Sequence, residues 1–500
     1  MIYGFNSFGY EGSLVVVESD IRDGIPSVDI SGLADSFVLC TWELVKTAIE
    51  RSGFEIPQKR ILIALSPFDL RKEEGFSLSI ALSLLVESKN NDVLIMGELE
   101  NDGNIIPCIK GTFAACQNAK QNGIKYAILP KNSKVPAGIK VYEAGNLKEA
   151  ADAILSLNTG DDRLFKERNA PADDFTTEDN ILFNDFSNEE KEAFDKTTGH
   201  NNLRFAMAVA IAGRHHLLTY GIPGDDKSCI LREVSMLLPK LTSDESNIVS
   251  RICSLVGVTT KDYETERPVR IPHPSVTIEG MCGGGAGCRP GIISLAHNGV
   301  LILDEAAEFR TSVLQMLRVP LSVGTITLSR AGRCTVFPAR FQLFMATSPC
   351  PCGNFGSKDR TCLCSKRAIE MYWKKLSYPI DSGIAIKVNA DDEDNSRKNF
   401  TIKELRNFIS TAWKRQLHRQ GKLNQDLSIR EVSEFIKLTD EAKVLFERET
   451  EGFSKREAVV ILELAQTIND ISENFSDELQ KIHIEEAIKL HGKIPYVTNI

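Results

Sequence analysis

The spacing of apolar residues predicts an α/β domain over residues 1–157. Short apolar runs of strand length alternate there with runs in which apolar residues recur at helical spacing. The strand-like runs are residues 14–17, 61–65 and 126–129, and the helical runs are residues 39–52, 77–86 and 111–122. Residues 158–183 are polar and acidic with little periodicity, so we predict that they form a linker.

The remaining residues divide into a second α/β domain and a helical domain. Residues 184–388 contain apolar runs typical of buried strands, and two short runs on either side of residues 330–333 predict a β-hairpin. The buried-strand runs are residues 216–220, 300–303 and 342–347. After a charged break, apolar residues repeat at helical spacing within residues 389–500, which predicts a small helical domain. The repeating residues are Leu405, Ile409 and Trp413, and then Val460, Leu464 and Ile468.

The composition of the chain limits the classes of protein to which it can belong. Of 500 residues, 42% are hydrophobic and 25% are charged, which is ordinary for a cytoplasmic globular protein with about three domains. No apolar run approaches the roughly 18 residues that a membrane span needs, so we expect no membrane association. The net charge of -9 argues against a surface that coats nucleic acid everywhere, so a nucleic-acid function would need a local basic patch.

A candidate phosphate-binding loop follows the strand-like run 216–220. Its residues are Gly221, Ile222, Pro223, Gly224, Asp225, Asp226, Lys227 and Ser228, and a helix-compatible run occupies residues 229–238. In this order, backbone N–H groups and a helix N-terminus can bind phosphate, so we predict that Lys227 neutralises the β- and γ-phosphates of ATP and that Ser228 ligates Mg²⁺. An ordinary Gly/Pro turn before a helix is the alternative.

The loop departs from the usual pattern at Asp226. A glycine normally stands there and allows the backbone to approach the phosphates closely. A carboxylate about 5 Å from a phosphate charge costs about 3 kcal/mol at an effective dielectric near 20. We therefore expect Asp226 to weaken nucleotide binding unless it turns outward or pairs with a cation.

Two carboxylates end the apolar run 300–303. We predict that Asp304 holds the magnesium through water and that Glu305 polarises the attacking water as a general base. A strand that merely exits to solvent through two acidic residues is the alternative. The upstream loop with Lys227 and Ser228 favours an ATPase.

Four of the twelve cysteines lie within residues 350–364. Cys350 and Cys352 form one C-x-C pair, and Cys362 and Cys364 form another. Four thiolates on a short turn-rich excursion can satisfy tetrahedral zinc, and the bound metal would stabilise a segment with little core. We predict structural zinc, with unligated cytosolic thiols as the alternative.

Several longer strings resemble one known family. Residues 289–299 (RPGIISLAHNG), 328–331 (LSRA), 337–343 (FPARFQL) and 349–353 (PCPCG) resemble the magnesium-chelatase-like (ComM) family, and the likeness extends over nearly the whole chain. The resemblance implies a P-loop AAA+ α/β domain with a C-terminal helical lid. It also implies a hexameric ring that drives branch migration of DNA during recombination and natural transformation.

The resemblance implies roles for three further positions. Ser348 stands at the sensor position where asparagine is usual, and Arg456, at the start of a helix, matches the second sensor that contacts the γ-phosphate. A surface arginine in a first helical turn is the alternative for Arg456. Ser382 or Gly383 stands where the family carries an arginine finger, a residue worth roughly three to five orders of magnitude in rate. Fast hydrolysis is therefore not expected.

The first domain resembles the Lon-protease-like domain of the same family. The likeness rests on residues 96–99 and 123–130. Lon cleaves with a serine activated by a lysine. Ser77 and Ser79 lack the glycine-rich turn that exposes such a nucleophile, and Lys110 is expected at the surface, so we predict no proteolysis.

Candidate DNA contacts lie beside a glycine-rich loop and at the predicted hairpin tip. In family members such loops line a central pore, so Arg289, Arg330 and Arg333 are predicted to grip DNA phosphates. Solvated hairpin charges are the alternative. The lone His273 is expected to be structural.

Three functions remain open at this point. The first is a ring-forming ATPase or helicase that remodels DNA. The second is a non-hydrolysing member that binds nucleotide, DNA or partner subunits as a structural or regulatory module, which Asp226, Ser348 and the missing arginine finger favour. The third, a metal-insertion subunit of a true chelatase, is weaker because those subunits lack the Lon-like domain.

Overall fold

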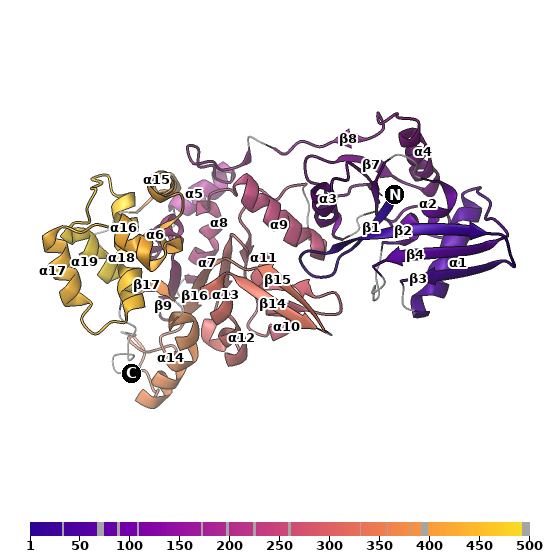
Figure 1. Cartoon of the computed structure of the whole chain (residues 1–500). Coiled ribbons are helices and arrows are strands. Elements are labelled where there is room, and N and C mark those ends of the chain that lie inside the picture. Colours follow the sequence, from indigo (N-terminus) through magenta and orange to yellow (C-terminus); the bar gives the residue numbers. More distant parts are fainter. Residues whose placement is uncertain are drawn as a thin grey trace.

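The computed structural model of the chain has three regions that follow one another in space. It describes residues 1–32, 35–67, 75–87, 91–107, 110–171, 174–196, 200–223, 227–258, 262–330, 332–357, 359–381, 383–391 and 399–492. An N-terminal α/β region lies at one end, a second α/β region lies in the middle, and C-terminal helices lie at the other end (Figure 1). No helix in these ranges is both long and apolar enough to pass through a bilayer.

A mixed eight-stranded sheet forms the N-terminal region, in the order β3-β4-β2-β1-β5-β6-β7-β8. Its strands are β1 (Ile2–Asn6), β2 (Ser13–Arg22), β3 (Ser27–Ser31), β4 (Arg60–Ser66), β5 (Val93–Ile95), β6 (Tyr126–Pro130), β7 (Lys140–Ala144) and β8 (Lys166–Glu167). Its helices are α1 (Asp35–Arg51), α2 (Ser77–Leu85), α3 (Thr112–Gln121) and α4 (Leu147–Asn158). The predicted strands and helices of this region are confirmed. Within the predicted linker, β8 pairs with β7 and so extends the sheet.

The second region is built on a parallel five-stranded sheet, in the order β10-β13-β16-β9-β17. Its strands are β9 (His216–Tyr220), β10 (Val269–Arg270), β13 (Val300–Leu303), β16 (Gln342–Thr347) and β17 (Ile384–Asn389). β9, β13 and β16 have the predicted bounds and are buried along their whole length, because helices cover both faces of the sheet. The mixed α/β architecture expected for an AAA+ protein of this class is confirmed.

Short helices and two small hairpins surround this sheet. The helices are α5 (Asn188–Lys196), α6 (Asn201–Gly213), α7 (Lys227–Arg232), α8 (Val234–Leu237), α9 (Ser243–Val256), α10 (Ile278–Cys282), α11 (Ile292–Leu295), η2 (Ala306–Glu308), α12 (Thr311–Met316), α13 (Arg318–Val323) and α14 (Lys366–Asp381). The predicted hairpin is confirmed as β14 (Thr325–Arg330) and β15 (Arg333–Pro338), and β11 (Gly283–Gly284) pairs with β12 (Arg289–Pro290). The single helix expected after the phosphate loop divides into α7 and α8 at Glu233, whose side chain pairs with the buried Arg204.

The C-terminal region is entirely helical in its described part. It contains α15 (Ile402–Gln420), η3 (Asn424–Asp426), α16 (Ile429–Phe435), α17 (Asp440–Glu449), α18 (Lys455–Ile471) and α19 (Lys481–His491). Capping boxes begin α15, α16 and α18, each with a Ser or Thr cap and a glutamate three residues later. The apolar faces of these helices share one hydrophobic core with α6 and β17, so the helices are packed onto the central sheet.

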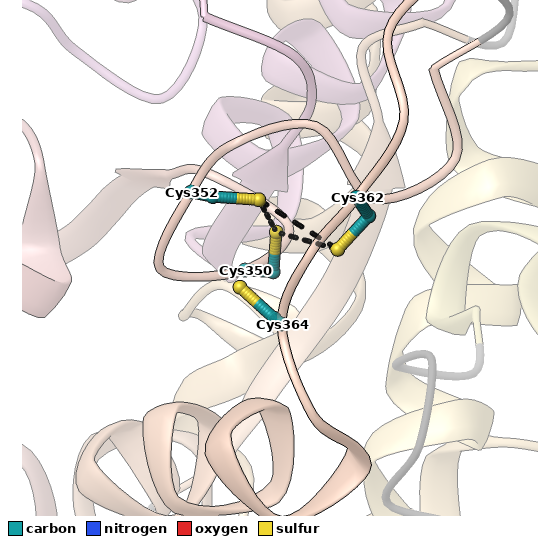
Figure 2. Close-up of side chains that lie close together, drawn as sticks. All are labelled: Cys350, Cys352, Cys362 and Cys364. Carbon is teal, nitrogen blue, oxygen red and sulfur yellow. Dashed lines mark hydrogen bonds between the residues drawn. The ribbon is translucent and has the colours of Figure 1, made fainter.

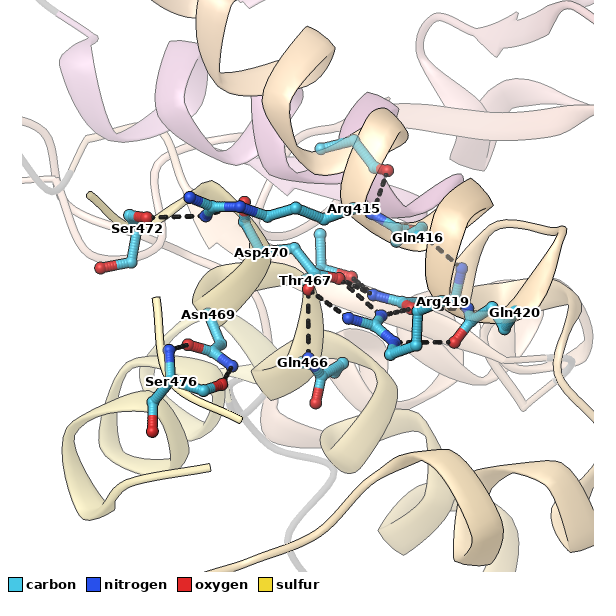
Figure 3. Close-up of polar contacts among 12 residues, drawn as sticks. Arg415, Gln416, Arg419, Gln420, Gln466, Thr467, Asn469, Asp470, Ser472 and Ser476 are labelled. Carbon is cyan, nitrogen blue, oxygen red and sulfur yellow. Dashed lines mark hydrogen bonds and ion pairs between the residues drawn. The ribbon is translucent and has the colours of Figure 1, made fainter. Parts of the chain in front are cut away.

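A buried polar network also joins these helices to each other (Figure 3). Asp470 is 0% exposed and accepts hydrogen bonds from Arg419 at 2.7 and 2.9 Å, from Asn424 at 2.9 Å and from Gln466 at 3.1 Å. Thr467 extends the network to the central region, because its hydroxyl lies 2.7 Å from His215 Nε2. We call these residues the lid network, after the helical lid that the family resemblance leads us to expect in this region.

The two α/β regions contact each other directly. The backbone N–H of Gly111, at the start of α3, donates to the carbonyl of Ser254 in α9 at 2.9 Å. Arg251 of α9 donates to the backbone carbonyls of Tyr10 and Glu11 in the β1–β2 loop. These bonds fix the N-terminal region against α9 of the central region.

Candidate functional site

The carboxyl ends of three neighbouring strands surround a cavity in the central region. β13, β16 and β9 are adjacent and parallel, so the residues that follow them meet at one edge of the sheet. A cavity of about 390 Å³ opens there. Its lining includes Pro223, Lys227, Ser228, Asp304, Glu305, Ala307, Glu308, Ala346, Thr347, Ser348 and Tyr372. Segments far apart in sequence therefore form one concave surface, which we call the cavity.

A hydrogen bond joins the phosphate loop to the acidic strand end. The Ser228 hydroxyl donates to Asp304 Oδ1 at 2.7 Å. Lys227 opens α7 and is 7% exposed, and its ammonium donates to the carbonyl of Ile222 at the start of the loop. A hydroxyl and a carboxylate this close are the kind of oxygen ligands that Mg²⁺ takes together with phosphate oxygens, so the residues present fit a magnesium ion.

Glu305 has a strained backbone. Its φ is 50°, in the left-handed region that non-glycine residues seldom adopt, and its N–H donates to Asp304 Oδ1 at 3.1 Å. Such a conformation costs on the order of 1–3 kcal/mol and persists where the surroundings impose it. The Glu305 side chain is exposed, and its carboxylate has no hydrogen-bond or ion-pair partner in the described part of the chain. It is available to a ligand in the cavity.

Further residues of the cavity lining come from the end of β16 and from α14. Ser348, the predicted sensor, follows β16 and lines the cavity. Beside it, the Tyr372 hydroxyl lies 2.7 Å from Thr347 Oγ1. Burial raises the pKa of Tyr372, so its hydroxyl stays protonated at neutral pH. The sequence did not indicate Tyr372, because α14 reaches the cavity only through tertiary packing.

The start of the phosphate loop is held by an aspartate that the sequence also did not indicate. Gly224, Asp225 and Asp226 lie outside the described residues, so the expectation about Asp226 stays a prediction. The backbone N–H of Ile222 donates to the Asp391 carboxylate, at 3.0 and 3.1 Å to its two oxygens. A Cβ atom on Gly221 would lie 2.8 Å from that carboxylate, so Gly221 permits this close approach.

Arg456 lies at the opposite edge of the sheet from the cavity. A Cβ atom on Gly383, which precedes β17, would lie 3.5 Å from Arg456 Nη2, and β17 begins beside His216, the first residue of β9. The phosphate loop follows the last residue of β9, roughly 13 Å away at about 3.3 Å per residue. Arg456 is exposed and is not among the described residues that line the cavity. The structure therefore does not bring it to the phosphate loop of the same chain.

The four predicted zinc ligands converge (Figure 2). Their Sγ atoms all lie within 4.8 Å of one another. The separations are 3.4 Å for Cys350–Cys352, 3.7 Å for Cys350–Cys362 and 3.6 Å for Cys352–Cys362. The backbone N–H of Asn354 lowers the pKa of the Cys352 thiol to about 6, whereas burial raises the pKa of Cys350. We call this group the cysteine cluster.

The predicted DNA contacts lie on neighbouring loops. Gly283 packs against Leu328 of β14, and Gly287 accepts a hydrogen bond from Gly9 N–H in the β1–β2 loop at 3.1 Å. Arg289 and Arg330 are exposed. The Arg333 guanidinium lies 5.0 Å from the centre of the Phe8 ring, so a residue of the N-terminal region covers one face of it.

The serines of the N-terminal region are tied into its interior. Ser77 is 2% exposed, donates to Glu98 at 2.7 Å and accepts from Leu99 N–H at 2.8 Å. Ser79 is 0% exposed and donates to the Phe76 carbonyl at 2.9 Å. Lys110 lies against Gly257 in the central region, and neither serine hydroxyl has a lysine partner among the described residues. His273 is exposed and bonds to Ser275 two residues away.

Three family models match consecutive parts of the chain. Subunit ChlI of Mg-chelatase matches residues 17–133, magnesium chelatase, subunit ChlI, matches residues 193–398, and its C-terminal model matches residues 401–491. The second of these segments contains every residue named above as lining the cavity.

Similar proteins match over nearly their whole length. YifB of Escherichia coli is 32% identical over 506 residues, which cover 96% of this chain and 95% of YifB. The chain belongs to the magnesium-chelatase-like family of ComM and YifB. Within this family, competence protein ComM of Haemophilus influenzae is 30% identical over 513 residues, covering 98% of this chain and 96% of ComM. YifB of Salmonella typhimurium is 30% identical over 500 residues, covering 96% of this chain and 95% of that relative.

Family membership confirms the resemblance that the motif strings indicated. It makes ATP and Mg²⁺ the expected ligands of the cavity, in agreement with its residue types. The roles of individual residues remain predictions.

Proposed function

We propose that this chain is an AAA+ protein that binds ATP with Mg²⁺ in the cavity and hydrolyses it to act on DNA. One observation carries the proposal: the Ser228–Asp304 hydrogen bond beside Lys227 and Glu305, at the edge where parallel strands end. If Asp304 and Glu305 only marked the point where β13 leaves the sheet for solvent, they would not be expected to line the same cavity as Lys227. Membership in the magnesium-chelatase-like family supports the same conclusion.

Each cavity residue has a distinct chemical task. Lys227 neutralises charge on the β- and γ-phosphates, and Ser228 and Asp304 hold the magnesium, which withdraws charge from the phosphate oxygens when bound. Glu305 orients and polarises the attacking water, for which its unpartnered carboxylate is suited. Ser348 and Tyr372 supply further hydroxyl groups in the cavity lining.

Rapid hydrolysis needs a second cationic side chain beside the γ-phosphate. Among the described residues that line the cavity of one chain, Lys227 is the only cationic one. We propose that subunits form a hexameric ring in which Arg456 serves the cavity of a neighbour. Its exposed guanidinium lies close to Gly383, which with Ser382 is one of the two positions where the family's arginine finger would stand. The arginine at this edge then substitutes in part for the missing finger.

DNA is the proposed substrate of the motor. Arg289, Arg330 and Arg333 lie on adjoining loops and provide a local basic patch on a chain with a net charge of -9. Phosphate contacts of this kind carry affinity without sequence readout. The name of competence protein ComM supports natural transformation as the process, and the family resemblance described above implies branch migration of DNA in recombination.

The remaining regions are proposed to support this core. Residues 1–157 are a Lon-like domain without peptidase activity, residues 158–183 connect it to the ATPase domain at 184–388, and residues 389–500 form the lid. We propose a cytoplasmic location. A second function is favoured by Asp226, by Ser348 and by the missing arginine finger at Ser382 or Gly383: a non-hydrolysing module that binds nucleotide or DNA in a structural or regulatory role.

ATP turnover by the purified full chain, with and without branched DNA, separates the two functions. Glu305→Gln is expected to lower turnover about 100-fold or more while fluorescent ATP still binds, because only the general base is lost. Lys227→Ala is expected to abolish binding itself, and Glu434→Gln, on the exposed side of α16, serves as the matched control. Tight ATP binding without turnover under any condition would favour the second function. Absence of ATP binding would refute the first function and would restrict the second to DNA binding.

A further inference from the structure

The cysteine cluster has the dimensions of a metal site. A tetrahedral zinc site with Zn–S bonds of about 2.3 Å has sulfurs about 3.8 Å apart. The three separations given above, 3.4 to 3.7 Å, are close to this value and far longer than a disulfide bond of about 2.05 Å. The described residues between β16 and α14 contain no helix or strand, and Leu363 is 88% exposed. Cys350 and Phe355 pack this segment on the apolar core below it, and a metal bound by the four thiolates would hold the remaining turns in place.

This segment packs directly on the phosphate loop. Gly353, which follows Cys352, is buried and has a φ of 76°. A Cβ atom there would lie 2.3 Å from Pro223 Cγ, so only glycine permits the contact. The conformation of the cluster and the position of Pro223, which lines the cavity, therefore depend on each other.

A second connection runs from the cluster to the end of β16 and to α14. Cys350 is 0% exposed and lies two residues after Ser348. Between them, the Pro349 carbonyl accepts a hydrogen bond from Trp373 Nε1 at 3.1 Å. Trp373 is 1% exposed and adjoins Tyr372 in α14, so the strand end, the cluster and α14 are locked together around the cavity.

We propose that the four cysteines bind one zinc ion and that this ion controls the nucleotide cavity by holding Pro223 and Ser348 in place. Zinc loss releases the segment that carries Gly353, and the phosphate loop loses the surface on which it packs. The cluster is therefore a metal-dependent switch on nucleotide binding. The effect on nucleotide rests on the proposed function, whereas the effect on the loop does not.

The test uses the full chain and begins with its metal content. Elemental analysis is expected to find about one zinc per chain, and Cys364→Ser is expected to lower that content strongly. Cys334→Ser is the matched control, because Cys334 is an exposed cysteine outside the cluster. Wild-type protein without bound metal after expression and reconstitution in zinc would overturn the proposal.

The coupling is measured by hydrogen–deuterium exchange of peptides that cover residues 216–232. Removing zinc with a chelator is expected to speed exchange in the phosphate loop, and re-adding zinc is expected to restore protection. Unchanged exchange there, with zinc demonstrably lost, would overturn the coupling. If Cys364→Ser fails to fold, chelation of the wild-type chain supplies the same comparison.

Nucleotide affinity then separates this inference from the proposed function. Zinc removal is expected to weaken binding of fluorescent ATP about tenfold, in the range seen when supporting shells of a site are disturbed. Equal affinity with and without zinc would contradict the inference. A zinc-loaded chain that binds no nucleotide, yet shows the change in exchange, would refute the proposed function and leave the switch on the loop standing.

Discussion

The lid network and the cavity are both clusters of polar residues, but they differ in how their polar atoms find hydrogen-bond partners. Asp470 is fully buried and accepts from three side chains, all of them protein partners. In the cavity, Asp304 is half-buried and accepts from Ser228, while the neighbouring Glu305 carboxylate faces open space. The same residue types thus build a closed network in one place and an open one in the other.

The difference distinguishes polar groups that stabilise the fold from polar groups that are available to bind a ligand. Desolvating a carboxylate is costly, so a buried one is retained only where hydrogen bonds compensate fully. An open carboxylate keeps its hydration and exchanges it for a cation or a reacting water. We therefore expect changes in the lid network to alter stability, and changes in the cavity to alter binding.

The largest expected effect comes from removing the centre of the closed network. Asp470→Ala leaves the Arg419 guanidinium without its carboxylate, and breaking such a pair costs about 3 kcal/mol or more. The free energy of unfolding, from urea denaturation, should fall by that amount. Glu473→Ala, at an exposed position just after α18, is the control and should change little. A stable Asp470→Ala variant would show that the network does not hold the lid.

A smaller effect is expected from pH, because burial raises the pKa of Glu463 in α18 to about 8. Asp426 raises it further, and Arg456 opposes the shift. The unfolded chain loses this proton near pH 4.5, whereas the folded chain keeps it until about pH 8. The contribution of this group to the free energy of unfolding is therefore fully present below about pH 4.5 and is lost progressively as the pH rises to 8.

Glu463→Gln tests this expectation by mimicking the protonated form at every pH. Between pH 6 and 8 the wild type should lose roughly 2 kcal/mol relative to the variant, at about 1.4 kcal/mol per pKa unit. Thermal unfolding of both proteins across this range is the measurement. Parallel pH profiles would mean that Glu463 titrates normally and that the lid interface is more hydrated than its burial indicates.

The sequence predicted the open cluster better than the closed one. Lys227, Ser228, Asp304 and Glu305 follow strands whose apolar runs are unmistakable, and parallel strands end at a common edge. Asp391 follows β17, which no sequence motif indicates. Asp391 accepts a hydrogen bond from Ile222 N–H only because β17 is the neighbour of β9 in the sheet. Local pattern identifies an element but not its neighbours, so residues recruited by packing are missed.

Arg456 is a second residue whose neighbours could not be predicted from the local sequence pattern. The start of α18 at Ser454, Lys455 and Arg456 was predicted and is confirmed. The edge of the sheet that the helix start faces could not be predicted, because it depends on how α18 crosses β17 and α6. Helix position follows from the shared core of many residues, and no single motif encodes it.

The smallest expected effects come from two hydroxyl groups, one in each cluster, and they sharpen the comparison most. Thr467 is 0% exposed, and its hydroxyl contacts His215 and accepts from Asn424 at 2.9 Å. Thr467→Val keeps the shape but removes the hydroxyl from its buried partners, at a cost of about 1 kcal/mol in unfolding free energy. Its ATP affinity should match that of the wild type.

Ser228→Ala should give the opposite result. The Ser228 hydroxyl borders the cavity, so water can replace it as a partner of Asp304, and the free energy of unfolding should stay within about 0.5 kcal/mol of the wild type. The Mg²⁺ concentration needed for half-maximal ATP binding should rise, because one oxygen ligand is lost. If both substitutions changed the free energy of unfolding and neither changed ATP binding, the Ser228–Asp304 bond would stabilise the fold in the way the lid network does. The main evidence for a magnesium ion in the cavity would then be lost.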